Sequence, residues 1–586
     1  MKTKMTLISL TLITLFAGGC AEQTTEIEDI VDGVPPPVIA PLPLPEQEHD
    51  LARAPGSRPE SDTVAGDTNT GLRAMSERAQ EQPAFVSAAA KRFDASHYRL
   101  TPSTGLQPYA ADREHYLHYA VNGVKQVAQE PVSTFSIDVD TAGYANVRRM
   151  LVQEGRLPPG DAVRLEEMIN YFSYGYPAPA STDEPFRVHT ELAVAPWSTQ
   201  HHLLQIGLKG FEPDLAERPA ANLVFLIDVS GSMRAPNKLG LVKHSLRLLV
   251  NTMTAQDRIA IAVYAGAAGT VLESTPGDQK ATILRAIDAL EAGGSTHGSA
   301  GIKLAYDLAE QHAISGGINR VIIASDGDMN VGTVNLEALK DLIEQKRATG
   351  IALTTLGFGA GNYNYALMEQ LADVGNGNAA YIDSLKEAQK VLVNEMQSTL
   401  LTIASDVKIQ VEFNPALVSE YRLIGYENRM LNREDFNNDK VDAGEIGAGH
   451  TVTALYEIVL RGSGGERIDN LRYADARPAS AGANSEELAH IKLRYKTPGA
   501  KTSKLLTQTV ALSDDNGALR NSSNDLRFAA SVAGFGQLLQ GGTFTGQWSY
   551  DDALALARQS RGDDLHGYRS ELIHLIELAQ SLSTRS

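Results

Sequence analysis

The sequence predicts an α/β protein whose central domain is doubly wound, with helices on both faces of a mostly parallel sheet. Between residues 221 and 402, short apolar runs typical of buried strands alternate with segments of helical period. The helical segments are long enough to cross between parallel strands. Oxygen-bearing side chains directly follow two of these strands, at residues 228–232 and 325–326. In such sheets, ligands bind at the carboxyl ends of the strands.

The elements of residues 221–402 follow one another in strict alternation. We expect strands at residues 223–227, 259–264, 320–324, 351–358 and 379–382. We expect helices at residues 238–253, 281–290, 299–312, 336–346, 365–372 and 385–401. A sheet built in this way is covered on both faces.

The regions on either side of the central domain have different patterns. Residues 96–220 are mixed α/β, with a strand near 133–139, helices near 144–152 and 163–171, and strands within 186–208. Residues 403–515 read as alternating strands of a sandwich or antiparallel sheet, which the strands before residue 221 are available to complete. Residues 516–586 return to helices, expected at 526–539, 550–558 and 568–582.

The first 20 residues have the pattern of an export signal. Basic residues precede an apolar run from Met5 to Phe16, and small residues lead to Cys20. Cys20 is the only cysteine of the chain, so it has no partner for an internal disulfide. The segment resembles a bacterial lipoprotein signal, which implies that Cys20 is acylated and anchors the chain to a membrane. Simple secretion is the alternative, because Ala17 stands where that family usually has a larger aliphatic residue.

The chain is expected to reside in the bacterial cell envelope. By resemblance to lipoprotein sorting, Ala21 after the cysteine favours the outer membrane, facing the periplasm, over the inner membrane. Residues 21–95 are polar and proline-rich, and we interpret them as a disordered tether. The formal net charge of -19 argues against a nucleic acid partner.

Five oxygen-bearing side chains of the central domain are expected to meet at one point. Asp228, Ser230 and Ser232 follow the first strand, Asp326 follows the strand at 320–324, and Thr296 lies in a loop before a helix. Hard oxygen ligands, few of them charged, suit Mg²⁺ or Mn²⁺ in octahedral geometry. The alternative is that these residues only cap helices and satisfy loop amides.

These five residues resemble the metal-ion-dependent adhesion site of von Willebrand factor A (VWA) domains. The resemblance implies a Rossmann-like fold and a bound Mg²⁺, with Mn²⁺ or Ca²⁺ as alternatives. It also implies that an Asp or Glu of a partner protein completes the coordination of the metal. The stretches 133–142, 166–172, 421–429 and 447–456 further resemble a family of bacterial VWA-domain lipoproteins, over about residue 98 to the C-terminus.

A second, weaker metal pattern lies in the region expected to be rich in strands. Asp435, Asn437, Asp439 and Asp442 have oxygen ligands near the spacing of a calcium-binding loop. Lys440 stands in place of the glycine of such a loop, so a solvated hairpin without metal is the alternative.

The sequence therefore predicts a binding protein rather than an enzyme. The predicted metal site lacks a positioned general base, and no nucleophile or phosphate-binding motif stands out. The expected partner is an envelope protein that offers a carboxylate. Two alternatives are an accessory or chaperone component of a metal- or ATP-dependent envelope machine, and a structural envelope protein with a purely stabilising metal.

Overall fold

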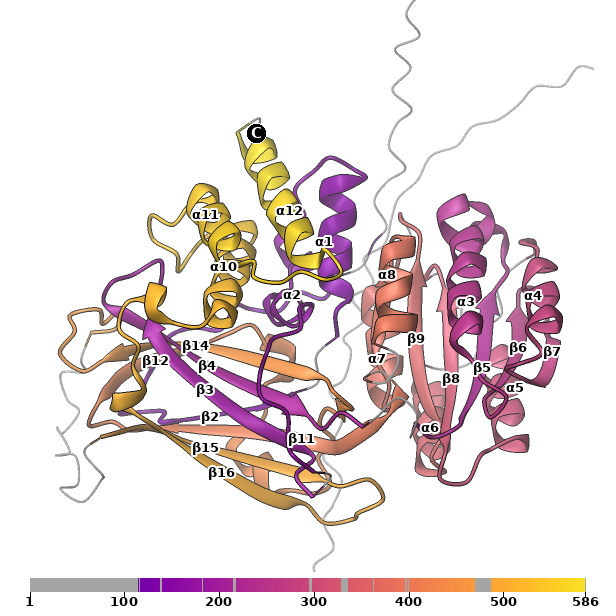
Figure 1. The fold of residues 1–586 in the computed structure, drawn as a ribbon, viewed down its shortest axis with the longest axis horizontal. Helices are drawn as coiled ribbons and strands as arrows, with labels where there is room; N and C mark the ends of the chain where they lie inside the picture. Colours follow the sequence, from indigo (N-terminus) through magenta and orange to yellow (C-terminus); the bar gives the residue numbers. More distant parts are fainter. Residues whose placement is uncertain are drawn as a thin grey trace, which may run out of the picture. The chain divides into compact units, whose positions relative to one another are not determined.

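The central domain is built on one six-stranded sheet in the computed structural model (Figure 1), in the order β10-β9-β8-β5-β6-β7. Its strands are β5 (Ala221–Asp228), β6 (Arg258–Tyr264), β7 (Ala268–Pro276), β8 (Ile318–Ser325), β9 (Ala352–Phe358) and β10 (Ala379–Ile382). Neighbouring strands pair in parallel, except that β7 runs antiparallel to β6 at one edge. The structure describes residues 114, 116–137, 140–181, 183–213, 218–294, 298–327, 336–361, 363–395, 398, 400–469 and 486–584.

Helices cover both faces of this sheet, as the sequence predicts. They are α3 (Leu241–Thr252), α4 (Lys280–Asp288), α5 (Gly298–Gln311), α6 (Leu336–Ala348), α7 (Tyr365–Val374) and α8 (Leu385–Gln389). Leu223, Phe225 and Ile227 of β5 pack on the side of α3, α4 and α8, whereas Val224 and Leu226 pack on the side of α5, α6 and α7. The alternation of strand side chains thus gives the sheet two separate apolar cores.

Three elements of the central domain differ from the sequence prediction. Strand β7 was not expected, because it is an edge strand in which few side chains are buried, so its apolar pattern is weak. The helix expected at 238–253 begins with a π-helical turn, Pro236–Gly240, before α3. The helix expected at 385–401 is interrupted: α8 passes into a π-helical turn at Lys390–Asn394, residues 398 and 400 are again helical, and β11 starts at Thr402.

The remaining described residues, within 114–213 and 402–584, are called here the flanking body. Its strands are β1 (Lys125–Gln126), β2 (Val132–Ser136), β3 (Phe186–Val194), β4 (His201–Gly210), β11 (Thr402–Phe413), β12 (Val418–Ile424), β13 (Ile446–Gly447), β14 (Thr451–Leu460), β15 (Glu487–Lys496) and β16 (Lys504–Ala511). One sheet has the order β1-β12-β14-β4-β3, and the other has the order β13-β11-β15-β16 with β2 also paired to β11. Apolar side chains of both sheets share one core, so they form a sandwich.

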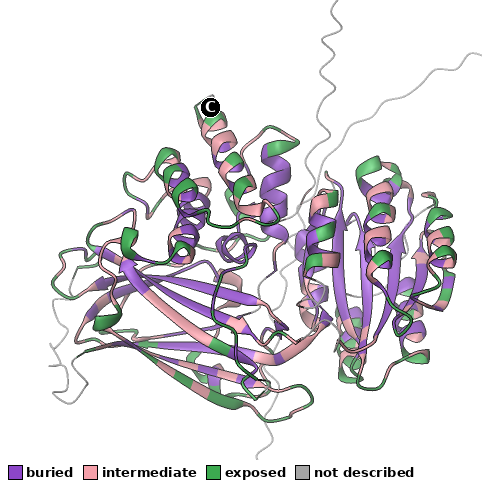
Figure 2. Ribbon diagram, viewed as in Figure 1, coloured by how far each residue is buried: buried purple, intermediate pink, exposed green. Residues whose placement is uncertain are grey.

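Helices from both ends of the chain cover the outer face of the first sheet (Figure 1). They are α1 (Ala142–Val152), α2 (Leu165–Asn170), α10 (Asn524–Leu539), α11 (Tyr550–Ser560) and α12 (Tyr568–Ser583). In β4, Leu204 and Ile206 face the sandwich core whereas Leu203 packs against the helices. Figure 2 shows the consequence: the strands under the helices are largely buried, and β16 on the far sheet carries exposed residues.

Strands before residue 221 complete the sheet of residues 403–515, as the sequence allows, and the flanking ranges are not separate domains. Strand β4, from the range 96–220, pairs with β14, from the range 403–515, and Leu204 lies opposite Tyr456. The helices of residues 516–586 share a core with α1 and α2. The three predicted ranges are therefore successive stretches of chain that fold together, with the central domain inserted between them.

A buried ion network joins the central domain to the flanking body. Arg148 of α1 donates to Asp383, which follows β10, to Glu387 of α8 and to Glu571 of α12. The Arg148 side chain is only 6% exposed, and those of Asp383 and Glu387 are 2% and 1% exposed. One guanidinium thus holds three segments that are far apart in sequence.

A cluster of acidic side chains forms a second part of this junction. Glu167 of α2 accepts hydrogen bonds from the Tyr365 hydroxyl and from the Gly143 amide. Glu369 of α7 accepts from Arg429 at 3.0 Å. Burial, followed by the nearby Glu369 carboxylate, raises the pKa of Glu167 to about 7.

Several predictions fall on residues outside the described ranges. They are the signal at residues 1–20 with Cys20, the tether at residues 21–95, and Thr296. Among the helices that the structure describes, none is long and apolar enough to cross a membrane.

Candidate metal centre

Asp228 is the last residue of β5 and lies fully buried at the carboxyl end of the sheet. Its Oδ1 accepts a hydrogen bond from the Ser230 backbone amide at 2.8 Å. Its Oδ2 accepts from the hydroxyls of Tyr264 and Ser325, each at 3.2 Å. Burial raises the pKa of the Asp228 carboxyl, and the hydrogen bonds from Ser230 oppose that shift. The carboxylate is therefore fixed in position by its neighbours.

The loop after β5 brings two serine hydroxyls together. The Oγ atoms of Ser230 and Ser232 lie 2.9 Å apart and share a hydrogen bond. Neighbouring ligands of an octahedral Mg²⁺, each about 2.1 Å from the ion, lie about 3 Å apart. The Gly231 amide donates to the Gly294 carbonyl at 3.1 Å, so the loop that leads to Thr296 runs beside the serine loop.

Asp326 comes directly after β8, the strand next to β5, and its side chain is fully buried. Its Oδ2 accepts a hydrogen bond from the ammonium group of Lys238 at 2.8 Å. The centre therefore contains a cation of the chain itself beside one of its two carboxylates.

The described residues fit a divalent ion with hard, mostly neutral ligands. Two hydroxyls and two carboxylates are brought to one edge of the sheet, and the hydroxyl pair has the spacing of adjacent octahedral ligands. In the described part of the chain, no group of three or more His, Cys, Asp or Glu could hold a metal.

The structure does not support the second metal pattern, at residues 435–442. Asp435 caps a short 3-10 helix (Arg433–Asn437) by accepting from the Asn432 amide. Asp439 accepts from the Ser503 hydroxyl at 2.6 Å, and Asp442 pairs with Arg347. Because these carboxylates are held by separate partners, they do not form a calcium loop. Asn437 ends the short helix.

Comparison with known proteins identifies the family. Family models match the chain in three ranges: "von Willebrand factor" at residues 110–205, "von Willebrand factor type A domain" at 222–395 and "Uncharacterized protein YfbK, C-terminal" at 398–582. The YfbK protein of Escherichia coli (strain K12) is 46% identical over 516 residues, which cover 87% of this chain and 86% of that protein. This chain belongs to the YfbK family.

More distant relatives share only part of the YfbK-family chain. Inter-alpha-trypsin inhibitor heavy chain H3 of Homo sapiens is 26% identical over 41% of this chain and 28% of its own length. A solved von Willebrand factor type A protein from Catenulispora acidiphila is 15% identical, with a TM-score of 0.37, and covers 67% of this chain and 89% of its own. The central domain is a VWA domain, and such domains generally serve protein–protein interaction rather than catalysis.

Two residues of the VWA centre, Tyr264 and Lys238, were missed in the sequence. Tyr264 ends β6, so the rule that sites lie at the carboxyl ends of strands would have found it. Ser325 lies in the predicted stretch 325–326, and the structure adds its hydrogen bond to Asp228. Lys238 carries no such signal, because it lies in a turn and reaches Asp326 across 88 positions of sequence.

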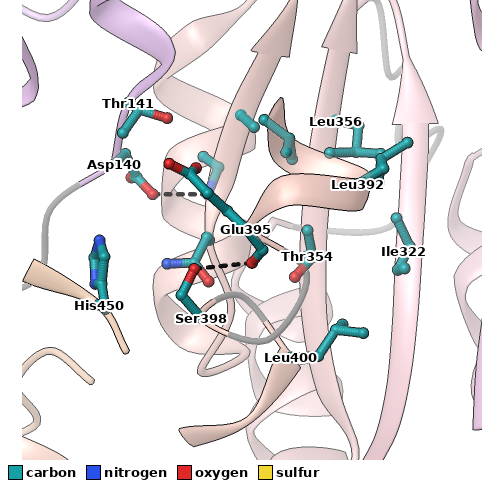
Figure 3. Close-up of a pocket in the computed structure, with 14 residues that line it drawn as sticks. Asp140, Thr141, Ile322, Thr354, Leu356, Leu392, Glu395, Ser398, Leu400 and His450 are labelled. Carbon is teal, nitrogen blue, oxygen red and sulfur yellow. Dashed lines mark hydrogen bonds between the residues drawn. The ribbon is translucent and has the colours of Figure 1, made fainter. Parts of the chain in front are cut away.

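A small cavity lies between the VWA domain and the flanking body (Figure 3). Its volume is about 60 Å³, and its lining includes Ile322 of β8, Leu356 of β9, Asp140 and His450. Figure 3 shows Asp140 directed at the start of β10, where its carboxylate accepts from the Ala379 amide at 2.7 Å. Ligand pockets are usually about 300 Å³ or larger, so this cavity is a packing gap of the junction.

Proposed function

We propose that this YfbK-family protein is an envelope lipoprotein that binds a protein partner through a divalent metal ion in its VWA domain. This proposal rests on the position of the Ser230 and Ser232 hydroxyls, which lie 2.9 Å apart. They follow β5, which ends at Asp228, and Asp326 follows the neighbouring strand β8. The metal is Mg²⁺, or Mn²⁺ or Ca²⁺ in its place, and Thr296 supplies a further oxygen.

The chemistry of the centre favours an acidic ligand. The hydroxyl ligands carry no charge and do not offset that of the dication, and a carboxylate from another protein then completes the coordination. The residues of this chain do the positioning: the Ser230 amide, Tyr264 and Ser325 hold Asp228, and the pairing of Gly231 with Gly294 holds the loop.

Membrane attachment through Cys20 is part of the same proposal. The signal pattern before Cys20 favours a membrane-anchored protein, and Ala21 after the cysteine favours the outer membrane, facing the periplasm. The partner is then an envelope protein that exposes an Asp or Glu.

Metal binding by purified protein is the first test. Wild-type protein is expected to bind Mn²⁺ with one site by calorimetry, and Ser230→Ala combined with Ser232→Ala, or Thr296→Ala alone, is expected to abolish or strongly weaken binding. Ser581→Ala, at an exposed position of α12, is the matched control and should bind as wild type. Equal Mn²⁺ binding by the double variant and the wild type would refute the proposed centre.

Partner capture separates a binding role from a purely stabilising metal. Cells are crosslinked with wild type, with the double serine variant and with chelator added, and the captured proteins are compared. Proteins lost in both the variant and the chelated sample are metal-dependent partners. If the metal raises only the melting temperature and the three captures are identical, the metal is structural.

A further inference from the structure

Lys238 places a positive charge inside the metal centre. Its ammonium donates to Asp326 Oδ2 at 2.8 Å, and its side chain is only 9% exposed. The lysine lies in the π-helical turn that precedes α3, whereas Asp326 follows β8. The contact therefore links two separate elements at the carboxyl edge of the sheet.

The path of the Lys238 side chain is fixed by the turn after β9. A Cβ atom added to Gly359 would lie 2.3 Å from Lys238 Cε and 2.5 Å from Cγ. The aliphatic stem thus lies directly against the Gly359 backbone, whose φ of +79° itself favours glycine. This packing directs the ammonium into the centre and away from solvent.

The charge of Lys238 changes the electrostatic balance of the centre. A divalent ion held by Asp228 and Asp326 alone is neutralised, because two carboxylates match its charge. With the Lys238 ammonium beside Asp326, the groups that the structure describes in the loaded centre, namely the ion, the two carboxylates and the ammonium, sum to a net positive charge. Charges that are several ångströms apart in a buried site interact strongly. The lysine therefore repels the metal and attracts an incoming carboxylate.

We propose that Lys238 makes the VWA centre hold its metal weakly until an acidic ligand arrives. This inference rests on the proposed function and adds a role for one residue. Lys238 acts as a positioning and tuning residue: it holds Asp326, opposes the dication and favours the anion. Metal and carboxylate consequently bind cooperatively, and each raises the affinity for the other by the same factor.

Calorimetric titration of the full-length protein with Mn²⁺ at one fixed pH tests this role. Lys238→Met removes the charge and the hydrogen bond, and Lys238→Gln removes the charge while retaining a donor. Both variants are expected to bind Mn²⁺ about tenfold more tightly than wild type, or better. Lys243→Met is the matched control, because Lys243 lies on α3 and donates to the Asp288 carbonyl outside the centre; its affinity should be unchanged.

Cooperativity is measured by repeating the titrations in sodium acetate and in sodium chloride of equal ionic strength. Acetate should strengthen Mn²⁺ binding by wild type more than by Lys238→Met. Melting curves check that the variants fold. If Lys238→Met does not fold, the Mn²⁺ affinity of Lys238→Gln in the two salts provides the same test. Unchanged or weaker Mn²⁺ binding in the folded variants would overturn the inference, because it would mean that Lys238 only supports the ligands.

Failure of the inference is distinguishable from failure of the proposed function. If wild type binds Mn²⁺ and the double serine variant does not, the proposed metal centre is supported. A Lys238→Gln variant with the Mn²⁺ affinity of wild type then overturns the tuning role of Lys238 alone. If wild type and the double serine variant bind equally, both the centre and the role of Lys238 are overturned.

Discussion

Replacing Arg148 with methionine should show how much the buried ion network stabilises the junction between the VWA domain and the flanking body. Arg148 donates to Asp383 Oδ2 at 2.8 Å, to Glu387 at 2.7 Å and to Glu571 at 2.8 Å. It also donates to the Tyr171 hydroxyl at 2.9 Å. Methionine approximates the length of the arginine stem but leaves these acceptors without their cation.

The expected loss in the free energy of unfolding follows from the burial of the carboxylates. Breaking a buried ion pair by removing one partner typically costs about 3–5 kcal/mol, because the remaining charge is uncompensated. Asp383 and Glu387 are both almost fully buried, whereas Glu571 is 18% exposed and also pairs with Lys386 at 3.0 Å. Burial already raises the pKa of Asp383, so protonation of this group limits the loss. We expect Arg148→Met to lower the free energy of unfolding by about 4 kcal/mol at pH 7.

Urea unfolding followed by circular dichroism measures this loss. Arg558→Met is the matched control, because Arg558 pairs with Glu577 on the surface and the two side chains are 56% and 41% exposed. An exposed pair contributes about 0–1 kcal/mol, so the control should unfold close to wild type. Adding Glu387→Gln to Arg148→Met should recover part of the loss, since it removes one of the buried charges.

Equal losses in Arg148→Met and Arg558→Met would refute the reasoning. That outcome would mean that the network is hydrated in solution and that apolar contacts alone hold the junction. A double variant that is less stable than Arg148→Met would contradict the assignment of the loss to unpaired buried charge.

Two further predictions concern the acidic cluster and the N-terminus. Glu167 has a folded-state pKa of about 7 against an ordinary value of 4.5, so the folded protein binds more protons than the unfolded chain and loses stability as pH rises from about 4.5 to 7. Glu167→Gln should therefore raise the free energy of unfolding by up to about 3 kcal/mol at pH 8 and by almost nothing at pH 4. Urea unfolding of wild type and Glu167→Gln at both pH values measures this difference. An equal gain in the free energy of unfolding at pH 4 and pH 8 would contradict the prediction. Cys20→Ala should move the protein from the membrane fraction to the soluble fraction and abolish labelling by fatty acid, as measured by fractionation and mass spectrometry; retention in the membrane fraction would exclude acylation of Cys20 as the anchor.

Patterns that are local in the sequence predicted the VWA domain well. The apolar strand before Asp228 and the spacing of Ser230 and Ser232 lie within a few residues of each other, so their geometry follows from strand alternation and one tight turn. The strand ends at Asp228 and Ser325 meet because β5 and β8 pair in parallel, which the intervening helices predict.

Contacts between distant segments explain what the sequence did not predict. The sequence left the strands before residue 221 available to the sheet of residues 403–515, but the specific pairing of β4 with β14 joins residues about 250 positions apart, and nothing in either strand specifies the other. The contact of Lys238 with Asp326 is also long-range, because the turn after β9 directs the lysine side chain toward Asp326. At residues 435–442 the spacing of oxygens was suitable for calcium, but Asp439 and Asp442 are engaged by Ser503 and Arg347 from other parts of the chain.

One short segment of the VWA domain takes part in both the metal centre and the junction. Gly359 lies under the stem of Lys238, and two residues later the Gly361 amide donates to Glu114 at 2.9 Å. Glu114 pairs in turn with Arg149 of α1 at 2.7 Å, next to the network of Arg148. The turn after β9 therefore packs against Lys238 on one side and, through Glu114, against α1 on the other, so a few residues of backbone contribute to both the candidate metal centre and the junction.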